Sequence, residues 1–183
     1  MKACCDGEGK ACQHKAPLHR KLALVGNPNS GKTTLFNLLT GARQRTGNWP
    51  GVTVERKEGS CRIQNEDLQV VDLPGTYSLD FGDTSADEQV AREFVQTNPD
   101  YLYLNIIDAS TLERGLYLSL QLRELNVPMI VVLNMMDVAE RRGMQISPHA
   151  LQERLGCPVI PVSLRQGRDL ANVHQAICHF DPT

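Results

Sequence analysis

The segment Gly26–Thr33 constrains this chain most, because it reads Gly-Asn-Pro-Asn-Ser-Gly-Lys-Thr between two segments of different character. The apolar run Leu22–Val25 before it is typical of a buried strand, and Leu35–Leu39 after it is typical of a helix. A phosphate-binding P-loop needs this strand–loop–helix context, because loop N–H groups and the positive helix end surround the phosphates. The sequence therefore predicts a nucleoside triphosphate as ligand.

Several residues of this loop have separate roles in phosphate binding. Gly26 and Gly31 permit tight turns and a close approach of the backbone to the ligand. Lys32 can reach the β- and γ-phosphates, and the Thr33 hydroxyl can be a ligand of Mg²⁺. The residues that we expect to contact the phosphates are Asn27, Pro28, Asn29, Ser30, Gly31, Lys32, Thr33 and Thr34.

Length and composition predict one soluble domain. The 183 residues are 41% hydrophobic and 22% charged, as in ordinary globular proteins. A formal net charge of −2 gives no sign of the basic surface that nucleic acids require. Residues 1–20 lack the apolar core of a signal peptide, and the apolar run Met129–Leu133 is too short to cross a bilayer. We therefore expect a soluble, cytosolic chain with no nucleic-acid partner.

The first 19 residues are polar and contain three of the six cysteines. Cys4, Cys5 and Cys12 lie near His14, which leaves a soft site for zinc or ferrous iron as an alternative, although the spacing matches no strong metal-binding pattern. We predict a flexible tail over residues 1–19 and a folded domain over residues 20–183. In the cytosol the thiols stay reduced, so no disulfide is expected.

Apolar runs alternate with helix-like segments along the rest of the chain. This alternation predicts an α/β fold, with helices on both faces of a mostly parallel six-stranded sheet. One strand carries four successive charged residues, 55–58, so we expect it to be a single antiparallel edge strand. The expected strands are Lys21–Val25, Val52–Ile63 (the edge strand), Leu68–Asp72, Tyr101–Asp108, Met129–Asn134 and Val159–Val162.

Capping motifs predict where several helices begin. The spacing Ser-x-x-Glu occurs at 85–88 and at 110–113, which is the spacing of a capping box. Ser147-Pro148 places proline at a first helical position. The last helix is expected over about 169–178.

Two stretches, Gly41–Gly51 and Pro74–Thr84, lack a regular pattern. They lie at the carboxyl ends of predicted strands or at the exit of the first predicted helix, where ligands bind in such sheets. Long loops at these places are usually functional, so we interpret both stretches as nucleotide-sensing switches. Thr53 is the best candidate for completing the Mg²⁺ shell when γ-phosphate is present, with Thr46 and Thr40 as alternatives. The expected nucleotide contacts of the first switch are Gly51, Val52 and Thr53.

A second phosphate motif, Asp72-Leu73-Pro74-Gly75, ends the strand before the second switch. The Asp72 carboxylate can hold Mg²⁺ through water, and the Gly75 N–H can contact the γ-phosphate. All four residues, Asp72, Leu73, Pro74 and Gly75, are expected to line the nucleotide site.

The segment Asn134-Met135-Met136-Asp137 predicts that the base is guanine. A carboxylate at Asp137 can accept from both N1–H and the exocyclic amine of guanine, a pair of donors that adenine lacks. Asn134 is expected to order the surrounding loops. The alternative to guanine selection is that Asp137 only caps a helix. The base site is completed by Met135, Asn134 and Asp137, with backbone contacts from Ser163, Leu164 and Arg165.

These motifs, in this order, resemble the five-motif pattern of small GTPases, so the expected fold is the P-loop GTPase fold. More closely, four segments resemble the N-terminal G domain of the ferrous iron transport protein B (FeoB) family. They are Gly26–Asn37, Gly47–Glu55, Val71–Leu79 and Asn134–Asp137. The resemblance implies a GTP-binding and GTP-hydrolysing domain that regulates or energises ferrous iron transport, on the cytoplasmic side of the bacterial inner membrane. It also implies two kinds of partner, the membrane permease part of the same protein and small Feo accessory proteins.

The resemblance further implies activation by K⁺, with Asn29, Gly47 and Trp49 as its ligands beside Mg²⁺ at Thr33, Thr53 and Asp72. Thr76 stands where many GTPases have a water-positioning glutamine, so slow hydrolysis is expected. Met135 replaces the lysine of the common Asn-Lys-x-Asp motif, so GDP release is expected to be fast. The resulting catalytic set is Asn29, Lys32, Thr53 and Gly75.

Two other functions remain open at this point. A potassium-dependent GTPase that acts in RNA modification or ribosome assembly shares the Gly-x-Pro-Asn-x-Gly-Lys loop, but no basic module accompanies it here. A nucleotide-dependent docking module with negligible turnover is also compatible with Thr76. Measured GTP hydrolysis separates this last alternative from the two enzymes.

Overall fold

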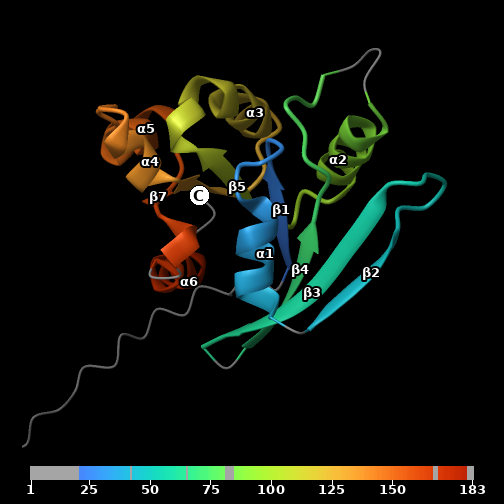
Figure 1. The fold of residues 1–183 in the computed structure, drawn as a ribbon. Coiled ribbons are helices and arrows are strands. Elements are labelled where there is room, and N and C mark those ends of the chain that lie inside the picture. The colour runs from blue at the N-terminus through green and yellow to red at the C-terminus, as the bar shows by residue number, and fades with distance from the viewer. Residues whose placement is uncertain (1–20, 42, 65, 81–84, 167–168, 181–183) are drawn as a thin grey trace, which may run out of the picture.

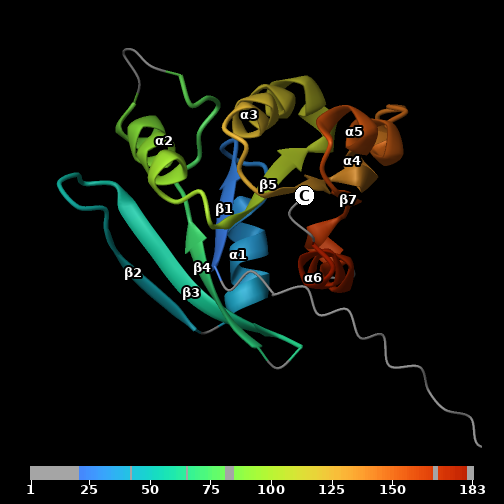
Figure 2. The same cartoon turned by 180° about the vertical axis from the view of Figure 1, so that it is seen from behind.

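A computed structural model describes residues 21–41, 43–64, 66–80, 85–166 and 169–180. A seven-stranded sheet of order β2-β3-β4-β1-β5-β6-β7 lies at its centre, with helices on both faces (Figures 1 and 2). The expected fold class is therefore confirmed. The strands are β1 (Lys21–Gly26), β2 (Gln44–Asn48), β3 (Glu55–Ile63), β4 (Glu66–Asp72), β5 (Leu102–Asp108), β6 (Met129–Asn134) and β7 (Val159–Pro161). The helices are α1 (Lys32–Thr40), α2 (Ala86–Thr97), α3 (Leu112–Glu124), α4 (Met136–Arg141), α5 (Pro148–Leu155) and α6 (Leu170–Cys178), with 3₁₀ turns η1 (Ala109–Thr111) and η2 (Leu164–Gln166).

Two apolar layers cover the two faces of the sheet, because side chains alternate along each strand. On β1, Ala23 and Val25 pack with residues of α2 and α3, whereas Leu22 and Leu24 pack with residues of α1 and α6. Strands β4, β1, β5, β6 and β7 are parallel. Their carboxyl ends therefore meet at one edge, which is where loops of this architecture bind ligands.

The sheet has one strand more than the sequence predicted. Strand β2 lies inside the expected loop Gly41–Gly51 and pairs antiparallel with β3, from Gln44↔Gly59 to Asn48↔Glu55. All five β2 side chains are exposed, so the strand has no apolar periodicity that could have indicated it. The edge strand is therefore β2, and the prediction of Val52–Ile63 as the edge strand is wrong. That segment forms a strand only from Glu55, as β3, which is second in the sheet. Both β2 and β3 run antiparallel to their neighbours.

The predicted helix starts are confirmed in three places and wrong in one. Ser85 and Glu88 form a capping box, and Ser147 Oγ accepts from the Ala150 N–H before α5. The last helix follows Asp169. The box predicted at 110–113 does not form, because the Asp108 carboxylate accepts the N–H of Ser110 (2.8 Å) and begins a 3₁₀ turn instead.

The cysteine- and histidine-containing tail predicted over residues 1–19 lies outside the described residues. Within the described ranges, no helix is long and apolar enough to cross a membrane.

Candidate functional site

The P-loop joins β1 to α1 at the carboxyl edge of the sheet. The Ser30 N–H donates to the Asn27 carbonyl (3.2 Å), and Gly31, with φ of 99°, directly precedes the helix. The first helical bond runs from the Leu35 N–H to the Gly31 carbonyl (3.0 Å), so the N–H groups of residues 32–34 have no acceptor within the helix. The first turn of α1 contains no acidic residue, and no described side chain caps it. This helix end can therefore bind an anion.

Two glycines are required by close contacts around the loop. A Cβ atom on Gly26 would lie 2.5 Å from the carbonyl oxygen of Ile106 on β5. A Cβ atom on Gly31 would lie 2.2 Å from the Asn134 side-chain nitrogen at the end of β6. The P-loop is thus packed directly against the two neighbouring strand ends.

Lys32 and Asp72 form an ion pair at the mouth of the P-loop. Lys32 Nζ lies 2.5 Å from Asp72 Oδ1, and the side chains are only 11% and 6% exposed. The register Leu24↔Asp72 between β1 and β4 places the carboxylate beside the loop. Burial raises the pKa of the Asp72 carboxyl above its ordinary value, and the neighbouring Lys32 ammonium opposes this shift.

A cavity of about 250 Å³ opens beside this ion pair. Thr33 and Asp72, two of the predicted Mg²⁺ ligands, both line it, together with Glu55 at the start of β3. Hydroxyl and carboxylate oxygens are the donors that Mg²⁺ prefers, so this part of the site fits the ion. Thr53, the third predicted ligand, is exposed and is not among the described residues that line the cavity.

The conformation of the first switch is fixed by its own contacts. Gly47 pairs with Arg56 in the β2–β3 hairpin, and the Trp49 carbonyl accepts the N–H of Val52 (3.3 Å). The Trp49 ring is buried against Phe94 of α2. The structure therefore does not bring Gly47 and Trp49 together with Asn29, which lies exposed in the P-loop with a left-handed backbone (φ 65°). Gly51 and Val52 are exposed in the same loop.

The second switch starts against the P-loop. A Cβ atom on Gly75 would lie 3.2 Å from Pro28 Cγ, and the Thr76 N–H donates to the Gly26 carbonyl (3.2 Å). The Thr76 side chain is buried, and its hydroxyl donates to the Ser78 carbonyl (2.6 Å). Thr76 therefore stabilises its own loop, and its hydroxyl is not available to orient a water molecule.

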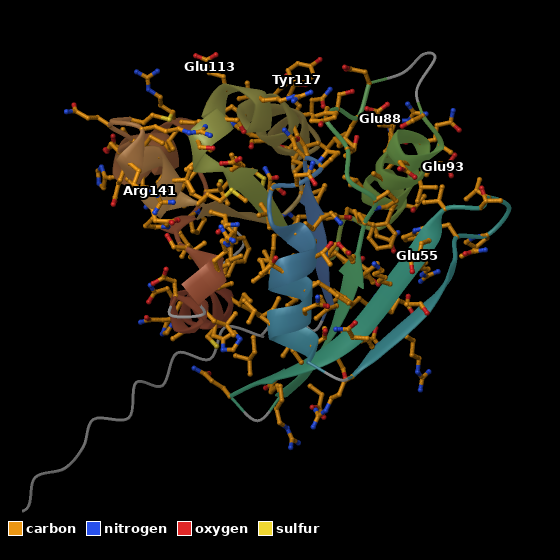
Figure 3. All side chains as sticks on the ribbon, in the orientation of Figure 1. Glu55, Glu88, Glu93, Glu113, Tyr117 and Arg141 are labelled. Atoms are coloured by element: carbon orange, nitrogen blue, oxygen red, sulfur yellow. The ribbon has the colours of Figure 1, made fainter. Side chains whose placement is uncertain are left out.

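Helix α3 contacts residues 77–80 of the second switch. The Gln121 side chain accepts the Leu79 N–H (2.8 Å) and donates to the Asp80 carboxylate (2.7 Å). Tyr117, labelled in Figure 3, donates its hydroxyl proton to the other Asp80 oxygen (2.9 Å). The Arg114 guanidinium stacks on the Tyr77 ring at 4.1 Å. One face of α3 thus fixes the conformation of residues 77–80.

Asn134 connects the P-loop to the loop after β7. Its side-chain nitrogen donates to the Ser30 carbonyl (2.9 Å), and its oxygen accepts the N–H of Leu164 (3.1 Å). Asn134 is 4% exposed, so both bonds are shielded from water. This agrees with the expectation that Asn134 orders the surrounding loops.

Asp137 lies beside Ser163, on the same edge of the sheet. Its backbone N–H donates to Ser163 Oγ (3.3 Å), and its carboxylate pairs with Arg141 (3.0 Å), one helical turn later. Burial opposes ionisation of the Asp137 carboxyl, but hydrogen bonds from Arg141 and Ser163 outweigh it and lower its pKa. The N-cap of α4 is Met135, with φ of 61°, so Asp137 is not the helix cap that the sequence left as an alternative.

Three residues that hold site residues or loops in position were not predicted from the sequence. Asp169 accepts the Ser163 N–H (2.7 Å) and thereby holds the loop that contains Ser163, Leu164 and the exposed Arg165. Gln121 is 42 positions from its partner Leu79, so no local pattern indicates the contact. Arg141 could have been found, because Asp and Arg four residues apart face each other on a helix.

Comparisons with known proteins agree with this geometry. Residues 20–177 match the sequence profile of the family described as Ferrous iron transport protein B. The Fe(2+) transporter FeoB of Shigella flexneri is 55% identical over 161 residues, which cover 87% of this chain and 21% of the relative. The chain therefore spans about a fifth of the length of this curated relative.

Solved structures of similar chains have the same fold. The cytosolic domain of L. pneumophila FeoB is 46% identical, with a TM-score of 0.82 over 88% of this chain and 70% of that one. A mutant of S. thermophilus NFeoB bound to GDP is 43% identical, with a TM-score of 0.81 over 88% and 63%. The cytosolic domain of the T. maritima FeoB iron transporter in its GMPPNP form is 41% identical, with a TM-score of 0.80 over 86% and 62%.

Proposed function

The chain belongs to the ferrous iron transport protein B family, and on this basis we propose that it binds and hydrolyses GTP and thereby regulates or energises ferrous iron transport. The GDP and GMPPNP structures of relatives with 41–43% identity support guanine nucleotide as the ligand. The Fe(2+) transporter name of the curated relative supports the process that is regulated. Since the chain spans about a fifth of that relative, we assign the membrane permease to other parts of the same protein, with this domain on the cytoplasmic side of the inner membrane.

The bridging position of Asn134 carries this proposal. Asn134 joins the Ser30 carbonyl of the phosphate loop to the Leu164 N–H of the base loop. Asp137, which can select guanine, follows it by three residues and contacts Ser163. Phosphate and base recognition are therefore parts of one connected site.

The proposed phosphate chemistry uses an exchange of partners at Lys32. On GTP binding, the Lys32 ammonium leaves Asp72 and contacts the β- and γ-phosphates, while the N–H groups of residues 32–34 donate to phosphate oxygens. Thr33 and Asp72 would hold Mg²⁺, with Thr53 added when the first switch closes. The ion would neutralise charge on the phosphates. The Gly75 N–H would donate to the γ-phosphate and so fix the second switch.

Hydrolysis also needs stabilisation of the charge that develops between the β- and γ-phosphates. We propose that K⁺ supplies it, held by Asn29 and by the Gly47 and Trp49 carbonyls after the first switch closes. The buried hydroxyl of Thr76 supports a cation in place of a side chain from the second switch. We expect GTP turnover to be faster in potassium than in sodium, and the difference to disappear in Asn29→Ala but not in the exposed control Asn172→Ala. Equal rates in both salts would contradict the K⁺ assignment and leave the GTPase assignment standing.

The role in transport is tested in a longer protein. In a chimeric protein, this chain takes the place of the matching segment of the Shigella flexneri transporter. Cellular uptake of ferrous iron is measured for the chimera with the unchanged segment of this chain and for the same chimera with Lys32→Ala. We expect uptake with the native segment and its loss in the variant at equal protein abundance. Equal uptake with both segments would show that the nucleotide site has no part in transport. The alternative of a GTPase acting on RNA is not favoured, since the relatives described above are iron transport proteins.

A further inference from the structure

Trp49 is buried within a segment that is otherwise exposed. It is the single tryptophan of the chain and is 8% exposed, whereas residues 43–48 and 50–53 are all exposed. Its ring meets Phe94 of α2 edge-to-face, with 5.4 Å between ring centroids, and Phe94 meets Tyr101 in the same way at 5.1 Å. The Arg56 guanidinium lies 4.6 Å from the Trp49 ring centroid. The indole therefore packs against both α2 and a cation of β3.

The same loop conformation determines where Thr53 lies. The Trp49 N–H donates to the Val54 carbonyl (2.9 Å), and the Val52 N–H donates to the Trp49 carbonyl (3.3 Å). These two bonds fold residues 49–54 into a compact turn. Thr53 sits exposed on this turn, outside the cavity that Thr33 and Asp72 line. Burial of the indole and the absence of Thr53 from the described lining of this cavity are thus features of one conformation.

We propose that Trp49 is a latch that holds the first switch open, and that GTP with Mg²⁺ must release the indole before Thr53 can reach the metal. This inference rests on the proposed GTPase function. Phe94 lies on α2, the helix that follows the second switch in the chain and is labelled in Figures 1 and 2. The contact of Trp49 with Phe94 therefore also connects the two switches. Release of Trp49 removes an aromatic contact from α2 at the moment when γ-phosphate binds the second switch.

The contacts of the latch are incomplete, which makes release possible. Among the described residues, the buried Trp49 Nε1 and Arg56 Nε atoms have no hydrogen-bond partner. A buried N–H without an acceptor costs free energy that offsets part of the gain from burying the ring. A cavity of about 350 Å³ beside the indole, lined also by Pro50 and Glu93, leaves the ring without full packing. Glu93 is labelled on α2 in Figure 3.

The fluorescence of Trp49 tests the latch directly, because no other tryptophan contributes. Acrylamide quenching is measured for the 183-residue chain alone, with GDP and Mg²⁺, and with GMPPNP and Mg²⁺, while calorimetry records saturation by each nucleotide. We expect weak quenching for the free chain and with GDP, and at least a three-fold larger quenching constant with GMPPNP. Saturation with GMPPNP without an increase in quenching would overturn the latch. Absence of binding in the calorimeter would instead overturn the proposed function.

A variant tests the contact with Arg56 without removing the fluorophore. Arg56→Ala removes the cation from the ring, and we expect stronger quenching of the free chain and an increase of about two- to five-fold in the ratio of GMPPNP to GDP affinity. Arg62→Ala, which removes an exposed ion pair with Asp67 on the same strand, is the matched control. We expect neither property to change in this control. The latch would be overturned if Arg56→Ala behaved like Arg62→Ala.

Discussion

Lys32 and Asp72 form an ion pair that joins the first residue of α1 to the last residue of β4. Both side chains are buried, and both belong to the groups that the proposed function assigns to the phosphates and Mg²⁺. Under the proposed function, nucleotide binding replaces an existing interaction at this point and does not fill a site made of unpaired charges. This relationship leads to two predictions about stability.

Removal of Lys32 should destabilise the fold, because it leaves a buried carboxylate without a counter-ion. We expect Lys32→Met to lower the free energy of unfolding by about 3 kcal/mol at pH 7. The double variant Lys32→Met/Asp72→Asn should recover most of this loss, since no buried charge remains. Urea denaturation without nucleotide measures all three chains. If Lys32→Met were as stable as the native chain, the ion pair would have no structural role.

The pH dependence of stability should depend on Asp72. Burial raises the pKa of its carboxyl despite the Lys32 ammonium, so the folded chain binds this proton more tightly than the unfolded chain. The contribution of Asp72 to the free energy of unfolding therefore falls as the pH rises through the folded-state pKa. We expect the free energy of unfolding of the native chain, minus that of Asp72→Asn, to decrease from about pH 4 to pH 7. Denaturation at several pH values tests this, and a difference that grew with pH would contradict it.

Asp137 should determine the choice of base. In Asp137→Asn, an amide replaces the carboxylate that accepts from N1–H and the exocyclic amine of guanine. We expect GDP affinity to fall by roughly 100-fold, which corresponds to two lost charge-assisted hydrogen bonds. We expect the affinity for xanthosine diphosphate (XDP) to rise, because xanthine has an acceptor oxygen where guanine has its exocyclic amine. Arg141→Ala is a control with an expected loss of at most about three-fold, because the Arg141 side chain is 67% exposed. Calorimetric titrations provide both affinities, and an unchanged preference for GDP in Asp137→Asn would refute the assignment.

Met135 should make GDP release fast. The residue occupies a left-handed conformation (φ 61°) at the start of α4, where many GTPases have a lysine whose stem covers the base. We expect Met135→Lys to slow GDP dissociation by about three- to ten-fold, since the added ammonium gains polar contacts while the apolar stem is kept. Stopped-flow displacement of a fluorescent GDP analogue measures the rate. A half-life of hours for the native chain would show that Met135 does not promote release.

Much of this site could be predicted because its residues follow strongly apolar strands. Runs such as Leu22–Val25 and Met129–Leu133 identify β1 and β6, and the polar residues after them then lie at one edge of a parallel sheet. Strand β2 could not be predicted, because all of its side chains are exposed and its partner strand determines its conformation. The predicted start of α3 was wrong because Asp108, two residues before Ser110, caps a 3₁₀ turn that precedes the helix.

Contacts of side chains with the backbone of other segments could not be predicted from the sequence either. Gln121 and Asp169 act through backbone N–H groups of other segments, and neither residue belongs to a recognised motif. The open first switch was unexpected as well, because burial of Trp49 against Phe94 depends on the packing of α2 on the sheet. Motifs therefore indicated candidate groups for nucleotide binding, but not the residues that hold these groups in position.

Release of inorganic phosphate from GTP by the 183-residue chain, in potassium and Mg²⁺, is the most direct test of GTP hydrolysis by this domain. ATP and the variant Lys32→Ala serve as controls for the base and for the P-loop. We predict slow, repeated turnover of GTP, no turnover of ATP above background, and loss of GTP turnover in the variant. If the native chain released no more phosphate from GTP than Lys32→Ala does, the site would bind nucleotide without hydrolysing it, and the account of this domain as a GTPase would be wrong.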